Sequence, residues 1–499
     1  MTLWRAWFYR EDAGISMMTA LMMMMLIGAT GLAIDGSRAY LARFKFQAAL
    51  DAAALATGST FGTDEELQQV ALEFVDRNFG IEGARVLSVS VNSNADLVTV
   101  SGRFELDTFF MQIFQQDEIQ MSAATEVKRA GGGLMVSLVL DNTGSMWSGA
   151  GSGQSRIEAL RGASQTLVDA LFGDATDTDD LRVAVVPYAA AVNPGLAGVV
   201  SDPIASPYFD PSDETAWRGC VMERAGNASL ADTDMSTGGY WTRYVYPPED
   251  DNDYTPGDAD SIVPGGIVNS NQITGPNIGC PTPVLPLTRY KSEIDAAIDA
   301  MSAWNRGGTL TDIGIAWGLR SLSPQAPFTE SGDEVDPETN ATLWNSQRWR
   351  RAMVIMTDGE SGFYNFPGGG DANQEGTSPN DAHPSASDHT TYGRWDATGS
   401  NAKAIFDAAP GMTYPNGTTD TSMRGKLNRR IHDLCETAKG QGIVVYTVVF
   451  TSSVGQSTRD VFRACASDPG KYWYAPDTDA LNDAFDQVGS DLSKLRITR

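Results

Sequence analysis

The sequence predicts an α/β fold with a mostly parallel sheet for the larger part of the chain, and three observations carry this prediction. Strands that are apolar throughout occur at residues 134–140, 181–193, 351–357 and 443–450. Segments with helical patterning follow or separate them, at 155–173, from Lys291 onward, at 423–442 and at 479–495. Strands that lack a polar face and alternate with helices indicate a sheet covered by helices on both sides.

The chain begins with a segment that predicts a transmembrane helix over residues 14–35, preceded by a cytoplasmic segment, 1–13. The run GISMMTALMMMMLIGATGLAIDG carries no charge before Asp35. About twenty apolar residues at 1.5 Å each span roughly 30 Å, the thickness of a bilayer core. A cleaved signal peptide is the alternative, but its apolar core is normally shorter and no clear small-x-small cleavage site follows.

Residues 36–130 predict a small α+β module. The run SRAYLARFKFQAALDAAALATGS is rich in Ala and Leu and is expected to continue the membrane helix outward as one rod. A helix is expected at 62–80. Two alternating strands, 86–92 and 97–106, are separated by SNAD and predict a hairpin, with a third strand following at 118–127. The run RAGGG then marks a domain boundary.

The charge and the cysteines restrict the class of protein. A formal charge of −27 disfavours nucleic acid and anionic lipid headgroups as partners, and suits either binding of hard cations or plain solubility. The four cysteines contain no CxxC pair, which gives a zinc site little support. Two disulfides between sequence neighbours are expected, Cys220 with Cys280 and Cys435 with Cys465, and buried free thiols are the alternative. Disulfides place the C-terminal part outside the cytoplasm.

Two long polar stretches, at about 200–284 and 361–421, interrupt the α/β pattern as insertions. The first contains the acidic run YPPEDDNDYTPGDADS. Its Asp251 and Asp253 are two residues apart, but the Gly and the terminal Glu of an EF-hand loop are out of place. We interpret this run as a solvated acidic loop.

A set of oxygen-bearing side chains is expected at the carboxyl edge of the sheet. In LVLDNTGSM an apolar strand ends at Asp141, and Thr143 and Ser145 follow at once. NRGGTLTDIG presents Thr309, and VIMTDGE ends a buried strand at Asp358. Because ligands gather at the carboxyl ends of parallel strands, we expect these five residues to converge. Two carboxylates and three hydroxyls form a hard-cation set for Mg²⁺, with Mn²⁺ or Ca²⁺ as alternatives. Each piece alone has a simpler reading, since DxTxS suits a helix cap and TDG a turn.

The order Asp-x-Thr-x-Ser, GGT and TDG resembles the von Willebrand factor A (VWA) domain, over residues 134–499. The resemblance implies a Rossmann-like fold and a metal-ion-dependent adhesion site (MIDAS), usually holding Mg²⁺. It implies that Thr143, Ser145 and Thr309 give hydroxyl oxygens, while Asp141 and Asp358 bind directly or through water. The neutral hydroxyls leave the cation under-neutralised, so that an open position can accept a carboxylate from a partner protein.

Further segments resemble the TadG-like proteins of tight-adherence (Flp) pilus systems: GIAWGLRSLSP, VVPYAAAVN and the final KLRIT, and at the start FYREDAG, the apolar helix and FQAALDAAALA. In related pilins a Glu five residues after the Gly marks prepilin peptidase cleavage, whereas here Gly14 is followed by Thr19. This departure favours a permanent anchor. The resemblance implies a single-pass protein of the bacterial inner membrane, with its C-terminal domain in the periplasm or at the cell surface and with pilus components among its partners.

Motifs for catalysis are missing from the sequence. GAGSG at 149–153 lacks the last Gly of a dinucleotide fingerprint, and neither GxxxxGK[ST] nor GxSxG occurs. None of the three histidines has a HExxH partner. We therefore expect a binding and assembly module and no enzyme. The alternatives are a structural pilus component with an idle metal site, and a hydrolase built into the insertions.

Overall fold

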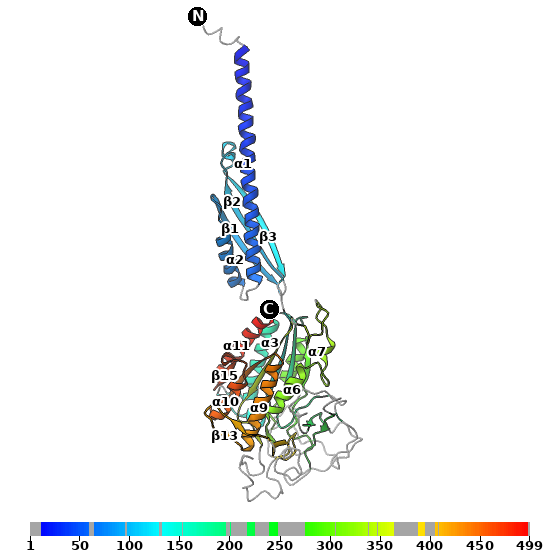
Figure 1. Ribbon diagram of the computed structural model, residues 1–499. Coiled ribbons are helices and arrows are strands. Elements are labelled where there is room, and N and C mark those ends of the chain that lie inside the picture. The colour runs from blue at the N-terminus through cyan, green and yellow to red at the C-terminus, as the bar shows by residue number, and fades with distance from the viewer. Residues whose placement is uncertain are drawn as a thin grey trace. The chain divides into compact units, whose positions relative to one another are not determined.

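The structure is a computed structural model. It describes residues 11–58, 64–94, 97–128, 132–151, 153–195, 200, 217–224, 239–247, 275–304, 306–337, 339–346, 348–363, 388–394, 405–407 and 409–497. These residues fall into two compact units, Met1–Gly131 and Gly132–Ile497. Figure 1 shows both units with their elements labelled.

The first unit is built on α1 (Glu11–Gly58), a continuous helix of 48 residues. Its N-terminal part is almost wholly exposed and apolar, so that the stretch from Ile15 to Ile27 presents side chains such as Met17 and Met25 outward. Within the described residues α1 is the one helix long and apolar enough to cross a membrane. The predicted rod is therefore confirmed, and the helix fits a single-pass anchor.

The C-terminal half of α1 packs on a small α+β module. α2 (Asp64–Asn78) lies beside it, and β1 (Ala84–Asn94), β2 (Leu97–Asp107) and β3 (Glu118–Lys128) form an antiparallel sheet in the order β1-β2-β3. The 3₁₀ helix η1 (Met111–Phe114) lies between β2 and β3. Phe46, Phe79 and Phe104 form the centre of the core, with ring centroids 4.6 to 4.9 Å apart. The hairpin and the third strand are present where the sequence predicts them.

The second unit contains a six-stranded sheet in the order β15-β14-β10-β4-β5-β8. Its strands are β4 (Leu134–Asp141), β5 (Leu181–Tyr188), β8 (Leu285–Thr288), β10 (Arg350–Thr357), β14 (Ile443–Phe450) and β15 (Tyr472–Ala475). Every neighbouring pair is parallel except β5 and β8, which are antiparallel. This arrangement confirms the predicted α/β, Rossmann-like fold.

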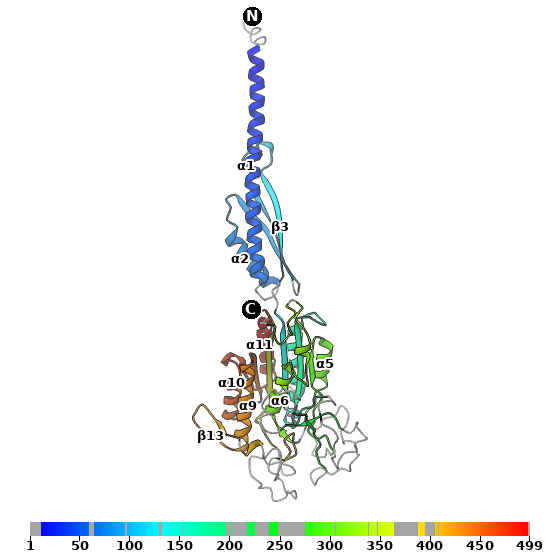
Figure 2. The same cartoon turned by 45° about the vertical axis from the view of Figure 1, so that its right-hand side comes forward.

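Helices cover both faces of this sheet (Figures 1 and 2). One layer holds α3 (Arg156–Phe172), α5 (Lys291–Asp299) and α11 (Thr478–Ile497), and the other holds α6 (Thr311–Leu322), α9 (Met423–Gly440) and α10 (Gln456–Cys465). Successive β4 residues alternate between the layers, since Val136 and Leu138 pack toward α3 while Met135 and Val139 pack toward α6. All eight residues of β4 are buried, which explains their continuous apolar pattern.

Short elements complete the second unit. They are η2 (Gly144–Trp147), β6 (Val221–Met222), β7 (Thr242–Arg243), β9 (Gly308–Thr309), α7 (Glu330–Asp333), β11 (Gly362–Phe363), β12 (Met412–Thr413), β13 (Thr419–Asp420) and η5 (Pro469–Lys471). Both expected disulfides are present, Cys220–Cys280 and Cys435–Cys465, which leaves no free cysteine. The interpretation of the acidic run concerns residues that lie, from 248 to 261, outside the described part of the chain.

The structure differs from the sequence prediction at several elements. The apolar run expected as one strand over 181–193 leaves the sheet at Tyr188, and Ala189 and Ala191 instead pack with Cys220 and Tyr244 of the first insertion. The apolar run therefore predicted burial correctly, but the strand is shorter than the run. The sequence also gave no prediction for α10, β8 or β15, because edge strands of four residues and a ten-residue helix carry too short a pattern.

Candidate functional site

The candidate site lies where two neighbouring strands end. β4 and β10 pair in parallel with Leu140 opposite Met356, so Asp141 and Asp358 leave the same edge of the sheet side by side. β5 is the neighbour of β4 on its other side and pairs Tyr188 with Asp141. The register of three parallel strands therefore brings together side chains that are far apart in sequence.

Asp141 is fully buried and accepts hydrogen bonds from every side. Its Oδ1 accepts from the Thr143 backbone N–H at 2.8 Å and from the Thr143 hydroxyl at 2.6 Å. Its Oδ2 accepts from the hydroxyls of Thr357 at 2.9 Å and Tyr188 at 3.2 Å, and from the Asp358 N–H at 3.3 Å. The carboxylate is thus fixed in orientation before any ligand arrives.

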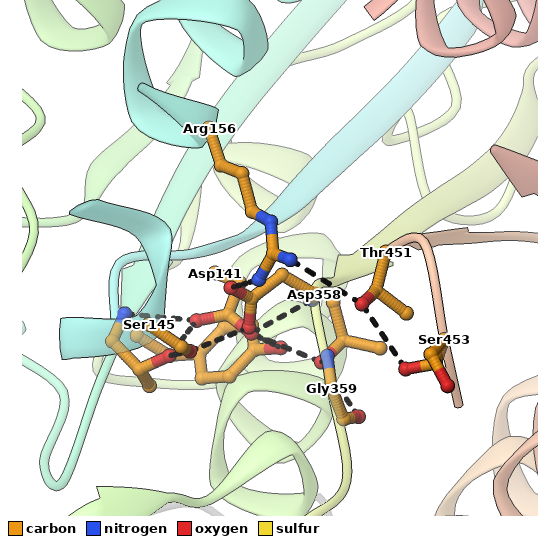
Figure 3. Close-up of polar contacts among 10 residues, drawn as sticks. Asp141, Ser145, Arg156, Asp358, Gly359, Thr451 and Ser453 are labelled. Atoms are coloured by element: carbon orange, nitrogen blue, oxygen red, sulfur yellow. Dashed lines mark hydrogen bonds and ion pairs between the residues drawn. The ribbon is translucent and has the colours of Figure 1, made fainter. Parts of the chain in front are cut away.

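A chain of hydroxyls joins the two carboxylates (Figure 3). Thr143 Oγ1 lies 3.1 Å from Ser145 Oγ, and the Ser145 hydroxyl donates to Asp358 Oδ1 at 2.7 Å. Ser145 is in η2, the single turn that follows β4 and turns the chain back over the strand ends. The DxTxS spacing therefore places Asp141, Thr143 and Ser145 around one point, together with Asp358.

The other oxygen of Asp358 contacts a cationic side chain, Arg156. Arg156 Nη1 lies 2.9 Å from Asp358 Oδ2, and the two side chains are 16% and 0% exposed. Arg156 Nη2 also donates to Thr451 Oγ1 at 3.4 Å, which carries the contact to the end of β14 (Figure 3). Arg156 is the first residue of α3, whose N-terminus is fixed by a capping box between Ser155 and Glu158.

The electrostatics of the site follow from burying two carboxyl groups together. Burial raises the pKa of Asp141, although hydrogen bonds from Thr143 and Thr357 oppose the shift. Burial and the neighbouring charge of Asp141 raise the pKa of Asp358 to about 7, against the opposing effect of Ser145 and Arg156. Keeping both carboxyl groups ionised therefore costs free energy, and a cation bound nearby would reduce this cost.

The structure brings four of the five predicted residues together and places the fifth, Thr309, in β9. Thr309 pairs with Gly362 of β11, and no hydrogen bond among the described residues joins it to Asp141, Ser145 or Asp358. Its loop is nevertheless attached to the site, because Trp304 N–H donates to Asn142 O at 2.7 Å and Thr311 Oγ1 lies 3.3 Å from Tyr188 OH. Thr309 thus stands in the segment that connects these two contacts.

Sequence reasoning missed three residues of this site: Arg156, Tyr188 and Thr357. Tyr188 and Thr357 are the last residues of β5 and β10, so aligning the strand ends with Asp141 would have found both. Arg156 belongs to no recognisable sequence motif. Its contact with Asp358 depends on the direction of α3, which the sequence does not reveal.

The donor set consists of hydroxyl and carboxylate oxygens. In the described part of the chain there is no group of three or more His, Cys, Asp or Glu side chains that could hold a metal ion. Any cation here would have to use the hydroxyls of Thr143 and Ser145 beside the two carboxylates. Such neutral and anionic oxygens suit hard cations and exclude soft ones.

The strand order and the helix layers define the second unit as a Rossmann-like α/β domain, and the DxTxS turn at its sheet edge is the feature in which it resembles a VWA domain. The N-terminal part of the chain matches a known protein family. Residues 14–60 match the model of the TadE/G-like family of Flp pilus-assembly proteins. This match confirms the resemblance that the N-terminal segment predicts.

Solved structures with a similar arrangement include pilus proteins. The pilus adhesin SpaC from Lactobacillus rhamnosus GG is 13% identical, with a TM-score of 0.35 over 82% of this chain and 34% of that one. The vWF domain of the type V pilus tip protein Mfa5 from Porphyromonas gingivalis is 13% identical, with a TM-score of 0.37 over 74% of this chain and 97% of that one. The minor pilin PilB from Streptococcus sanguinis is 12% identical, with a TM-score of 0.33 over 82% of this chain and 78% of that one.

This chain spans about a third of the length of SpaC. A search of curated proteins found no relative that matches.

Proposed function

We propose that this protein is a membrane-anchored binding module that holds a protein partner through a divalent cation, in the assembly of a pilus or in surface adhesion. The single observation that supports this best is the contact of Ser145 with Asp358, 2.7 Å, across two strand ends that are far apart in sequence. It belongs to a cluster in which Asp141, Asp358 and Thr143 are buried, Ser145 is exposed, and one guanidinium lies beside Asp358. A purely structural turn has no need of a second carboxylate.

In the proposal, Mg²⁺ is the preferred cation and Mn²⁺ and Ca²⁺ are alternatives. Ser145, Thr143 and Asp358 supply oxygens, with Thr309 reaching the cation from its loop. Asp141, which already accepts five hydrogen bonds, orients the Thr143 hydroxyl and acts directly or through water. When bound, the cation supplies Lewis acidity and an open position for a partner's carboxylate.

Arg156 has a specific role in this proposal. Its guanidinium contacts Asp358 Oδ2, while Ser145 contacts Oδ1, and it neutralises part of the buried negative charge. It therefore opposes cation binding electrostatically, and also stabilises the site when no cation is bound.

The proposed location follows from α1 and from the disulfides. α1 provides the single membrane span, in the bacterial inner membrane, and the second unit lies on the extracytoplasmic side, in the periplasm or at the cell surface. Both cysteine pairs are oxidised, as is usual outside the cytoplasm. Pilus components are the expected partners because residues 14–60 match a pilus-assembly family.

The experiment that tests this function captures partners with the full-length protein in detergent micelles. We expect a carboxylate-bearing protein partner to be retained in Mg²⁺, lost in chelator and lost by Asp141→Asn. Asp483→Asn, an exposed carboxylate on α11, is the matched control and is expected to retain the partner.

Two outcomes would favour the alternative functions. Pilus formation that survives Asp141→Asn unchanged would indicate a structural component with an idle metal site. Metal-dependent turnover in a screen of the purified protein would indicate a hydrolase.

A further inference from the structure

The turn between β2 and β3 is unusually apolar for an exposed loop. Residues 109–114 read FFMQIF, and no charged residue occurs between Asp107 and Asp117. Phe109, Ile113 and Phe114 are 63%, 65% and 58% exposed. A soluble protein seldom leaves several large apolar side chains together in water, so such a patch marks a surface that is covered by something.

This loop lies against the part of α1 that is expected to cross the membrane (Figure 1). Gly31 is buried under Phe110, so closely that a Cβ at Gly31 would stand 2.5 Å from the Phe110 Cβ. Three residues earlier, a Cβ at Gly28 would stand 3.4 Å from the ring of Phe114. The loop therefore descends along α1 toward its N-terminus, in the direction of the apolar stretch.

The backbone of the loop is satisfied by a carboxylate from α1. Asp35 Oδ1 accepts from the Phe109 N–H at 3.1 Å, and Oδ2 accepts from those of Phe110 and Met111 at 2.8 Å each. The Thr108 hydroxyl donates to the Gln116 carbonyl at 2.5 Å and closes the base of the loop. Backbone groups need such internal partners where water is scarce, as they do inside a bilayer.

The depth of the loop can be placed along α1. Arg38 stacks its guanidinium 3.9 Å from the Phe109 ring centre and donates to the Asp107 carbonyl at 3.1 Å, as a cation at headgroup level does. Gly28 is seven residues before Asp35, so Phe114 lies about 10 Å farther along the helix axis. A bilayer leaflet has about 15 Å of hydrocarbon. The tip of the loop therefore reaches well inside one leaflet.

We propose that residues 109–114 form a membrane wedge that inserts into the leaflet on the side of the folded units, with lipid acyl chains as its occupant. The wedge rests on the proposed anchor, because its depth is measured along α1. An apolar groove of about 350 Å³ between α1 and the loop, lined by Met23, Met24, Ile27, Ile113 and Phe114 among others, continues the lipid-facing surface of the helix. Because the groove continues the lipid-facing surface of α1, acyl chains are its proposed occupant. In this proposal the wedge also fixes the rotation of α1 relative to the bilayer.

The experiment measures membrane depth with a fluorophore on single cysteines, since the native cysteines are all in disulfides. Full-length Leu26→Cys, Ile113→Cys and Ser122→Cys are labelled with nitrobenzoxadiazole in phosphatidylcholine vesicles that contain acyl-chain nitroxide lipid. Leu26 lies on exposed α1 and Ser122 is exposed on β3. We expect the labels at 26 and 113 to lose at least half of their fluorescence, and the label at 122 to lose almost none.

The three labels separate failure of the wedge from failure of the anchor. Quenching at 26 without quenching at 113 would overturn the wedge and leave the anchor standing. A label at 113 that is shielded from aqueous iodide but not quenched by lipid would show that protein, such as a second copy, covers the loop, and would also overturn the wedge. If the label at 26 is not quenched, both the anchor and the wedge are overturned.

A second pair of variants tests the fit between α1 and the loop. Gly31→Leu in the Ile113→Cys protein is expected to displace Phe110 and to reduce the quenching at 113 at least twofold. Gly36→Leu on the same helix is the matched control, because a Cβ there meets nothing within 4 Å, and it is expected to leave quenching unchanged. Equal quenching in all three backgrounds would overturn the packing on which the depth of the loop depends.

Discussion

Asp141 and Asp358, separated by more than two hundred residues in sequence, are adjacent at the edge of the sheet, where the backbone N–H of Asp358 donates to Asp141 Oδ2 at 3.3 Å. Both side chains are buried, and Ser145 and Arg156 contact the second carboxylate from opposite sides. Two carboxylates this close together carry more negative charge than one guanidinium neutralises. The pair therefore favours a cation of higher charge. Three predictions concern this pair of carboxylates, and a fourth concerns the disulfide between α9 and α10.

Asp141→Asn is expected to abolish Mg²⁺ binding while the fold persists. The amide preserves the shape of the side chain but removes the negative charge, and it keeps one oxygen for the donors Thr357 and Tyr188. Isothermal titration calorimetry with MgCl₂ measures the loss, which should exceed a hundredfold in Kd. Circular dichroism checks the fold, and affinity retained in a folded variant would refute the assignment of the site.

Arg156→Gln is expected to tighten Mg²⁺ binding by at least tenfold, about 1.4 kcal/mol. The substitution removes a positive charge 2.9 Å from Asp358 Oδ2 and leaves a shorter, neutral side chain that can still donate a hydrogen bond. The same variant should unfold at a lower temperature in chelator, because a buried carboxylate loses its charge partner. Arg161→Gln, farther along α3, serves as the control in both measurements. Weaker binding by Arg156→Gln would mean that the guanidinium supports the cation instead of opposing it.

The stability of the metal-free protein is expected to fall as the pH rises from about 4 to 7. The pKa of Asp358 is raised to about 7 in the folded state, from an ordinary value of 3.8. Between these values the folded state binds a proton that the unfolded state has lost, so the free energy of unfolding decreases with pH by up to about 1.4 kcal/mol per pH unit. Thermal unfolding in chelator across this range measures the slope. Asp358→Asn should flatten it, and an identical slope in the variant would rule out this cause.

Replacement of both Cys435 and Cys465 by Ala is expected to cost about 2–4 kcal/mol of unfolding free energy. The bond links α9 to the end of α10 over a separation of 30 residues, on one face of the sheet. Urea denaturation under non-reducing conditions measures the loss. Reductant added to the intact protein breaks both disulfides, so it should cause the same loss of stability only if Cys220–Cys280 contributes little. The Cys220/Cys280 double variant measures that contribution separately. A midpoint unchanged by the first replacement would contradict the prediction.

Much of the fold was accessible from the sequence because its signals are local. The apolar runs of β4, β10 and β14 are continuous because each strand is buried on both faces, and the helices between them repeat every three or four residues. The alternation of apolar and polar residues in β1 and β2 likewise predicted a sheet with one covered face. Short edge strands such as β8 and β15 were missed, since their residues depend on neighbours that only the assembled sheet provides.

The sequence by itself determined which oxygen-bearing side chains end the strands, because Asp141, Thr143, Ser145 and Asp358 lie directly beside apolar runs that stop. It also determined the long apolar helix and the pairing of cysteines that are neighbours in sequence. The tertiary structure alone decided that Arg156 lies on Asp358, that Tyr188 and Thr357 hold Asp141, and that the FFMQIF loop lies along α1 beside Gly31. The reason is physical: composition and periodicity record what each segment buries, whereas contacts between distant segments depend on strand register and on the direction in which helices and loops leave the sheet.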